Sequence, residues 1–343
     1  SLSLYVVASI KRNSIESAES GVKYFILGAL SSGILLYGFS LVYGFTGHTS
    51  FDGISQSLTQ LEILPIGLVF GLVFVLVGLA FKVSAVPFHM WTPDVYEGAP
   101  TSITAFFAIV PKIAATALIF RFCLEPFAKF NFEWTQVIFF LSVASMFLGA
   151  IAAIAQKNLK RLLAYSSIGH VGYVLIALVS SSEQGLKSAS IYMFIYLVMN
   201  IAVFAIILSL KKSNSYVEKI SELSGLSKSN PIISVCLAII MLSMAGIPPF
   251  IGFFGKFYVF ISAVESELYI LAVLGVLASV ISAFYYLRII KGMYFDDKTD
   301  SEIFEFTISN EAKVILTILM ITISFFIVRP SLLTNIVANI SLI

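Results

Sequence analysis

A lysine, a histidine and two carboxylates lie together in the stretch Phe81–Pro100, which reads FKVSAVPFHMWTPDVYEGAP. The stretch directly follows an apolar run that is long enough to cross a membrane. Lys82 therefore lies where a charged side chain costs roughly 2.5–3.5 kcal/mol to insert. Removal from water favours the neutral form of a lysine, and a lysine beside a little water can then take up and release a proton. The residue types in this stretch predict proton-transfer chemistry.

Three further lysines lie inside apolar segments, as Lys82 does. They are Lys23, Lys112 and Lys256, and no carboxylate lies deep in a full apolar segment. Lys112 is about ten residues from either end of its segment, too far for its side chain to reach an interface easily. An interfacial position stays an alternative for Lys23, near the start of its helix, and for Lys82, which is followed by Trp91. The positions of Lys82, Lys112 and Lys256 suit residues that load and release protons.

Two histidines accompany these lysines. His89 lies seven residues after Lys82, and His170 lies in another apolar segment, in the run YSSIGHVGY. One interpretation is that each is a hydrogen-bonded core residue. The other is that they link the lysines through water, since the unperturbed pKa of imidazole is about 6.5. The histidines, His48 among them, show no ligand spacing and so predict no metal site.

The composition predicts an integral membrane protein. Hydrophobic residues make up 59% of the chain and charged residues 12%, and the mean hydropathy is +0.98. Soluble domains average about 25% charged residues. The net charge of +2 comes with no basic stripe for a phosphate backbone, so we predict no nucleic-acid partner. Cys123 and Cys236 both fall inside apolar runs, where we interpret them as packing residues.

Apolar segments of membrane-spanning length recur along the chain, which predicts an all-α polytopic protein. We place them at Ser20–Phe45, Leu61–Val86, Ile103–Leu124, Trp134–Ala155, Leu162–Ser180, Leu186–Leu210, Pro231–Val264, Leu268–Tyr294 and Lys313–Val328. Residues 1–12 resemble the second half of a helix, so we expect further helices before Ser1. The prediction is a single transmembrane domain over residues 1–343, with a helix fragment followed by about nine helices.

Two of these segments are interrupted. Pro87 and Pro93 flank His89 and predict a helix break on either side of it. The run Gly246–Pro249 interrupts the long segment Pro231–Val264. A broken helix inside a bilayer must be buried in protein or line a wet cavity. Broken segments paired in this way predict an inverted-repeat transporter with its site near the middle of the membrane.

Alternate loops are rich in basic residues. The basic set is Lys11, Arg12, Lys157, Lys160, Arg161, Lys211, Lys212, Lys219, Lys228, Arg288, Lys291 and Lys298. By the positive-inside rule, these loops face the cytoplasm or the mitochondrial matrix. Asp94 and Glu97 fall on the same side without basic neighbours in sequence, so we expect that loop to pack into protein. The long connections Lys211–Asn230 and Phe295–Asn310 have the length of lateral or amphipathic linkers.

Three long runs resemble, in order, the antiporter-like membrane subunits of respiratory complex I. They are FKVSAVPFHMWTPDVYEGAPTSITAF, LLAYSSIGHVGYVL and MLSMAGIPPFIGFFGKFYVF. The TPDVYEGAP run looks most like the chain N (subunit 2) branch. The resemblance covers essentially the whole chain. It implies a proton-pumping, antiporter-like bundle of two inverted repeats that is N-terminally incomplete here.

The same resemblance implies roles for individual residues. Lys82 matches the lysine of the first broken helix, whose glutamate partner is expected just before Ser1. Lys112 matches the central relay lysine, and Lys256 the lysine of the second broken helix on the exit side. Auxiliary positions along the same polar axis are Lys23, His89 and His170.

The function implied is that of a proton-translocating subunit of NADH:quinone oxidoreductase, an enzyme of the translocase class. The chain has no dinucleotide, phosphate, iron–sulfur or haem motif, so we expect NADH, FMN, iron–sulfur clusters and quinone on other subunits. The expected partners are other membrane-arm subunits, the lipid bilayer and protons, in a bacterial cytoplasmic or mitochondrial inner membrane. Two alternatives are a multisubunit sodium/proton antiporter without electron transfer and a scaffold whose lysines are only assembly contacts.

Overall fold

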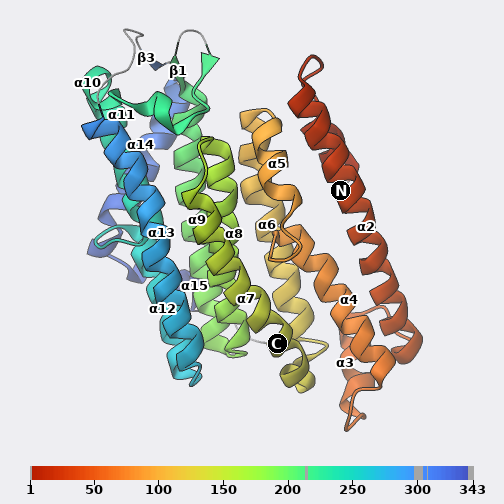
Figure 1. The fold of residues 1–343 in the computed structure, drawn as a ribbon. Coiled ribbons are helices and arrows are strands. Elements are labelled where there is room, and N and C mark those ends of the chain that lie inside the picture. The colour runs from red at the N-terminus through yellow and green to blue at the C-terminus, as the bar shows by residue number, and fades with distance from the viewer. Residues whose placement is uncertain (1, 213–214, 297–303, 307, 339–343) are drawn as a thin grey trace.

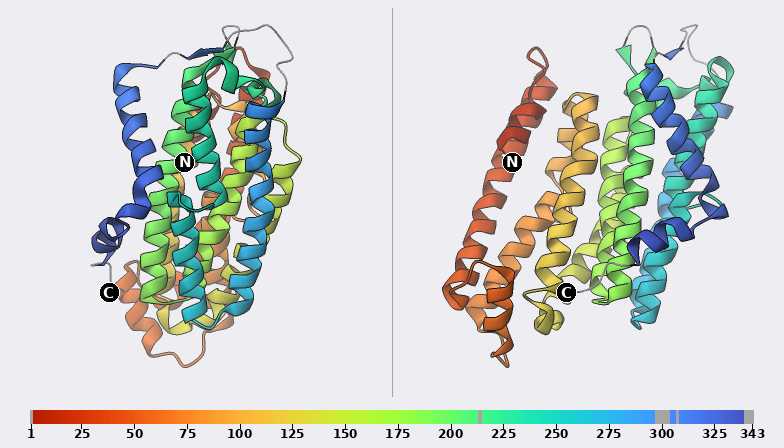
Figure 2. Two further views of the ribbon diagram at one scale, coloured as in Figure 1. Left: turned by 90° about the vertical axis from the view of Figure 1, so that its left-hand side faces the viewer. Right: turned by 180° about the vertical axis from the view of Figure 1, so that it is seen from behind.

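The computed structural model describes residues 2–212, 215–296, 304–306 and 308–338. Its helices run side by side along one axis, with α2 and α4 at one edge of the bundle and α13 and α14 at the other (Figures 1 and 2). The helices are α1 (Leu2–Ala8), α2 (Ile15–Thr46), α3 (Phe51–Thr59), α4 (Ile66–Val83), α5 (Trp91–Gly98), α6 (Thr101–Leu124), α7 (Asn131–Ile154), α8 (Leu159–Val179), α9 (Glu183–Ser209), α10 (Leu226–Ser229), α11 (Pro231–Ala245), α12 (Ile251–Glu265), α13 (Tyr269–Phe295), α14 (Asn310–Phe325) and α15 (Ser331–Val337).

Eight of the described helices are long and apolar enough to cross a membrane: α2, α4, α6, α7, α8, α9, α13 and α14, where α7 is extended by the short helix η1 (Ala128–Phe130) and α14 by η3 (Phe326–Val328). The shorter helices α11 and α12 follow one another across a break and together occupy the predicted segment Pro231–Val264. A polytopic helical membrane protein with two broken helices is therefore confirmed.

Helix α8 is the central helix of the bundle, and 19 of its 21 residues are buried. It packs on α5, α7, α9 and α12. Glycines allow the closest of these contacts, since a Cβ on Gly149 of α7 would lie 2.7 Å from the backbone nitrogen of Gly169. Small residues bring helix backbones together in this way in membranes, where dispersion and hydrogen bonds drive association. This close approach sets the position of α8 against α7.

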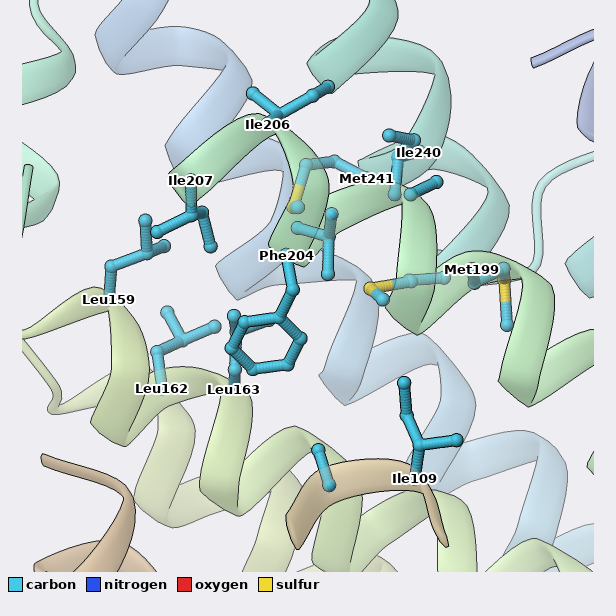
Figure 3. Close-up of a cluster of buried hydrophobic side chains, with 14 of the residues drawn as sticks. Ile109, Leu159, Leu162, Leu163, Met199, Phe204, Ile206, Ile207, Ile240 and Met241 are labelled. Carbon is cyan, nitrogen blue, oxygen red and sulfur yellow. The ribbon is translucent and has the colours of Figure 1, made fainter. Parts of the chain in front are cut away.

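A large apolar cluster holds α8 against α9 and α11 near one end of the bundle. Figure 3 shows Phe204 of α9 lying among Leu159, Leu162 and Leu163 of α8, with Met241 of α11 close by. These side chains are buried, so they fix the relative positions of three helices. All three helices carry or adjoin the polar residues described below.

The first break lies between α4 and α5. Helix α4 ends at Val83, and Ser84 follows in a left-handed conformation with φ of 67°. The expectation that Pro93 also breaks the helix is wrong, because Pro93 lies in the first turn of α5. The backbone N–H of a first-turn residue has no partner within the helix, so a proline there removes no hydrogen bond.

The second break lies between α11 and α12. Gly246 ends α11 with φ of 86°, and its N–H donates to the carbonyls of Leu242 and Ser243. A Cβ on Gly246 would lie 2.9 Å from Cδ of Lys256. Glycine is favoured at this position by the left-handed backbone, and a side chain there would also displace the end of Lys256.

Most of the basic loops predicted to share one membrane face do lie together at one end of the bundle. Arg288 of α13 donates to the carbonyls of Ile154 and Gln156, and Lys160 lies 3.8 Å from Glu218. Lys298 lies outside the described residues. The opposite end holds Lys129, whose ammonium donates to the carbonyls of Thr59 and Leu61.

The long linkers at the basic end contain structure that the sequence did not predict. A small antiparallel sheet joins them in the order β2-β1-β3, with Leu210 paired to Phe306 and Lys211 to Tyr216 (Figure 1). Its strands are β1 (Leu210–Lys212), β2 (Ser215–Tyr216) and β3 (Phe304–Phe306), and the short helix η2 (Ile220–Leu223) follows β2. The sheet ties the end of α9 to the segment before α14.

Candidate functional site

Lys112 lies in the middle of α6, where its side chain is only 1% exposed. Its Nζ donates to Ser167 Oγ of α8 at 2.5 Å and lies 5.5 Å from the centre of the Tyr96 ring. A buried cation needs such partners, because an unpaired one is very costly. The hydroxyl accepts a hydrogen bond and the ring face attracts positive charge, but neither neutralises it. Lys112 is therefore held in place, and it forms no ion pair with a carboxylate among the described residues.

Lys256 lies on α12 and is 4% exposed. Its ammonium donates to the carbonyl of Ala245, at the end of α11, and to Ser279 Oγ of α13, both at 2.8 Å. It also lies 4.9 Å from the centre of the Tyr173 ring. The last carbonyls of a helix have no partner within it and carry partial negative charge. The second break thus supplies a site for the lysine.

His170 lies on α8 and is 5% exposed. Its Nδ1 is 2.7 Å from the hydroxyl of Tyr192 on α9, and its Nε2 is 3.1 Å from the hydroxyl of Tyr286 on α13. Ser166 Oγ lies 2.5 Å from the same Tyr286 hydroxyl. The imidazole therefore belongs to a buried chain of hydroxyl groups that spans three helices.

Two small cavities flank His170. One is bounded by His170, Ser166, Tyr286 and Lys256, and the other by His170 and Lys112. Each has a cavity volume of about 10 Å³, close to the ~10–15 Å³ that one water needs. The first cavity has several polar groups to bind a water. His170 is thus the group that borders both lysine sites.

Lys82 lies in the last turn of α4, beside the first break, and is half-buried. Polar groups hold the chain around it: Thr92 donates to Ser84 Oγ at 2.6 Å, and the Val86 N–H donates to Ser145 Oγ at 2.9 Å. His89 follows in the turn before α5. Its Nδ1 is enclosed and has no hydrogen-bond partner among the described residues. The first break is therefore a polar region inside an apolar bundle.

Lys23 has two carboxylate partners, both of which lie outside the predicted apolar segments. Its ammonium lies 2.6 Å from Glu19 and 2.7 Å from Asp94, and its side chain is 41% exposed. Arg161 of α8 binds Asp94 at 2.6 Å and Glu97 at 2.9 Å. The prediction that the Asp94 and Glu97 loop packs into protein is confirmed. Lys23 thus belongs to an ion-pair network that joins α2, α5 and α8.

The sequence analysis missed several polar residues of this region. Lys160 was assigned to a loop, yet it lies in the first turn of α8, is buried and donates to the carbonyl of Ala99. Tyr192 and Tyr286 were interpreted as part of the apolar segments. The signal that was available is the hydroxyl-rich run YSSIGHVGY in α8, which has more polar groups than a lipid-facing helix needs.

Known proteins share this sequence and architecture. A family profile described as NADH:quinone oxidoreductase/Mrp antiporter, TM, matches residues 1–282. The NADH-quinone oxidoreductase subunit N of Rhodospirillum rubrum is 53% identical over 335 residues, which cover 98% of this chain and 68% of that protein. The chain belongs to this family. Subunit N of Pelagibacter ubique is also 53% identical, over 100% of this chain and 72% of that protein.

Solved structures agree with the family assignment. A chain of the respiratory complex I of Thermus thermophilus, solved with bound aureothin, has a TM-score of 0.82 at 31% identity and covers 97% of this chain and 71% of that chain. The Mrp complex of a Dietzia species contains a chain with a TM-score of 0.83 at 20% identity, over 98% and 70% of the two chains. The second likeness concerns the fold alone. The resemblance to antiporter-like complex I subunits is confirmed.

Proposed function

We propose that this chain is a proton-translocating membrane-arm subunit of an NADH:quinone oxidoreductase, in which Lys82, Lys112, His170 and Lys256 carry the protons. The observation that supports the route is the arrangement around His170. Lys112 and Lys256 are each buried, and each borders a water-sized cavity that the imidazole shares. The subunit is multi-pass in a bacterial cytoplasmic or mitochondrial inner membrane, with other membrane-arm subunits as partners.

The chemistry follows from the environment of the lysines. Water is largely excluded, so charges act on one another more strongly than in bulk solvent. A proton arriving at Lys112 raises the free energy of a second cation at Lys256, and release at Lys256 lowers it again. Hydroxyl partners such as Ser167 and Ser279 hold both the charged and the neutral amine. The lysines can therefore change charge without a change of fold.

The first break is the proposed entry to this route. Lys82 lies at the carboxyl end of α4, where the helix dipole favours a cation, and the turn beside it carries Ser84, His89 and Thr92. A change of charge or hydration at Lys82 reaches Lys112 through α5, because Tyr96 of α5 lies under the Lys112 ammonium. Lys23 and His89 are auxiliary members of the proposed relay.

Electron transfer belongs to other subunits in this proposal. Among the described residues there is no group of three or more histidine, cysteine, aspartate or glutamate side chains that could hold a metal ion. NADH, FMN, the iron–sulfur clusters and the quinone are assigned to partner chains. This chain supplies the proton route and the membrane-spanning support for it.

The test is pumping per electron in the assembled complex. Lys82→Met and Lys112→Met in the full-length subunit should lower the protons moved per NADH oxidised, because methionine keeps the stem and loses the amine. Lys187→Met is the matched control, since Lys187 lies away from the relay and pairs with Glu183. Unchanged stoichiometry in the Lys82 and Lys112 variants would refute the proposed relay.

The antiporter alternative predicts different behaviour. A sodium/proton antiporter would exchange cations without NADH oxidation, so purified complexes lacking redox subunits would move sodium against a proton gradient. The 53% identity to subunit N proteins, against 20% to a chain of the Mrp complex, favours the oxidoreductase. The scaffold alternative predicts that the methionine variants lower complex yield and leave pumping per electron intact.

A further inference from the structure

Both ring nitrogens of His170 are taken by tyrosine hydroxyls. Tyr192 lies 2.7 Å from Nδ1 and Tyr286 lies 3.1 Å from Nε2, and all three side chains are buried. An imidazole nitrogen has one bonding direction in the ring plane, either an N–H or a lone pair. In this arrangement neither direction is open to a water in the flanking cavities. A proton that reaches or leaves the ring must therefore cross a tyrosine oxygen.

The neutral ring orders the two hydroxyls in opposite senses. A neutral imidazole has one N–H and one lone pair. If Nδ1 carries the hydrogen, it donates to Tyr192, and the Tyr286 hydroxyl donates to Nε2. In the other tautomer, Nε2 donates to Tyr286, whose own hydrogen is then free to point to Ser166 or to the cavity shared with Lys256. The tautomer of His170 thus sets the direction of the hydroxyl chain that faces Lys256.

The two tyrosines differ in how they connect to the lysine cavities. Tyr286 lines the cavity that contains Lys256 and contacts Ser166, which precedes the Ser167 that holds Lys112. On the other side of the ring, Tyr196 of α9 lines the cavity that contains Lys112. Tyr192 lies one turn before Tyr196 on the same face of α9, and it also packs on α12, where a Cβ on Gly255 would lie 3.3 Å from Tyr192 Cδ2. Tyr286 accordingly connects the ring to the Lys256 cavity, and Tyr192 connects it to the Lys112 cavity only through its α9 neighbour Tyr196.

We propose that Tyr192 and Tyr286 are proton-carrying residues of the relay, and that every proton passing His170 crosses both hydroxyl groups. The proposal rests on the proposed function and adds two residues to it. It also assigns His170 a defined mode of action. The ring exchanges tautomers between two fixed hydroxyls and does not bind water directly.

The transfer balances in protons. Tyr192 passes its hydroxyl hydrogen to Nδ1 and takes up a new proton from the Lys112 side. The Nε2 hydrogen passes to the Tyr286 oxygen, and the former hydrogen of Tyr286 leaves toward the Lys256 cavity. Two O–H bonds and one N–H bond break, and the same numbers form, so both tyrosines and the ring end neutral. Before a second proton follows the same way, the hydroxyls and the ring reorient.

The test uses Tyr192→Phe and Tyr286→Phe in the full-length subunit within the assembled complex. Each change keeps the buried ring and removes only the hydroxyl. Loss of a positioned acid–base group slows proton transfer by about 10²–10⁴-fold, so we expect pumping per NADH oxidised to fall at least about tenfold. Tyr24→Phe is the control, since Tyr24 is equally buried but stacks on Trp91. NADH oxidation with an artificial acceptor measures the amount of complex.

A second variant covers the case in which the phenylalanine variants do not assemble. His170→Gln keeps one donor and one acceptor toward the tyrosines but cannot exchange a hydrogen between them, so it should assemble and not pump. Normal pumping in any one of Tyr192→Phe, Tyr286→Phe or His170→Gln would overturn the inference. If Lys82→Met and Lys112→Met lose pumping while the tyrosine variants keep it, the proposed function stands and this inference falls.

Discussion

At the first break the chain turns through Ser84, and at the second it turns through Gly246, both with left-handed backbone. The lysines differ more than the turns. Lys82 precedes its break and lies in the last turn of α4, whereas Lys256 follows its break and reaches back to the carbonyl of Ala245. Lys82 is thus a last-turn residue of one half-helix, and the Lys256 amine contacts the carboxyl end of another. Backbone dipoles favour a cation at such an end. Each break thus pairs a lysine with the carboxyl end of a half-helix, and the lysine comes from that half-helix at the first break and from the following one at the second.

The surroundings of the two lysines also differ. Lys256 is buried and has two hydrogen-bond acceptors in fixed positions, Ala245 and Ser279. Lys82 is half-buried, and the polar contacts of its break, such as Val86 with Ser145, join backbone and hydroxyl groups around it. The second break is therefore built around its lysine. At the first break, these contacts hold the turn itself, and Lys82 is less enclosed than Lys256.

Arginine at each break should give the largest effect. Arginine cannot release its proton in a protein, so Lys82→Arg and Lys256→Arg should both abolish pumping per NADH. The yields of complex should separate the two breaks, because added volume in a packed site costs about 1–3 kcal/mol and only Lys256 is tightly enclosed. Complex abundance in membranes measures this, with Lys187→Arg as control. Equal yields would contradict the difference in packing.

Removal of one serine at each break should separate chemistry from stability. Ser279→Ala takes an acceptor from Lys256, a contact to a charged group that contributes about 1.5–3 kcal/mol. Pumping should fall roughly tenfold while the complex still forms, since 1.4 kcal/mol is about a factor of ten. Ser145→Ala leaves the Val86 N–H unpaired, which should lower the thermal stability and leave pumping per NADH unchanged. The reverse pattern would mean that the two serines have been assigned the wrong roles.

Exchange of the turn residues should have a smaller and asymmetric effect. Gly246→Ser adds a Cβ in left-handed backbone, at about 1–2 kcal/mol, and places it against Lys256. Ser84→Gly removes that backbone cost but also loses the Thr92 hydrogen bond, about 0.5–1.5 kcal/mol, so the two nearly cancel. Thermal unfolding of the purified complex compares the variants. A stability loss in Ser84→Gly as large as in Gly246→Ser would show that Thr92 dominates.

The ion pairs beside the first break should give the smallest effect. Asp94→Asn removes the carboxylate shared by Lys23 and Arg161. These side chains are partly exposed, and such pairs contribute about 0.2–1 kcal/mol. We expect a slight loss of thermal stability in the variant. High salt screens ion pairs, so it should lower the thermal stability of the wild type more than that of the variant. A large loss of pumping would instead place Asp94 in the proton route.

Much of this architecture could be predicted from the sequence, because insertion into a bilayer imposes long apolar segments and penalises charges. Lys112 and the second break were found on these grounds alone. The pairing of Lys23 with Asp94 could not be found in this way, since Asp94 lies 71 residues away and segment patterns do not say which helices pack together. The hydroxyls of Tyr192 and Tyr286 were missed for the same reason, and Lys160 because a basic residue at a helix end suggests solvent. The sheet joins linkers whose pairing depends on where α9 ends and where α14 begins.

The central position of α8 has an electrical consequence. Ser166, Ser167 and His170 all lie on this one helix, and nearly every residue of α8 is buried against other helices. A proton held on His170 is therefore separated from the lipid by a layer of protein. The low dielectric of that layer opposes any sideways escape of charge. The surrounding helices thus keep protons on the proposed route from leaking into the lipid, so the proton gradient is not dissipated through this subunit.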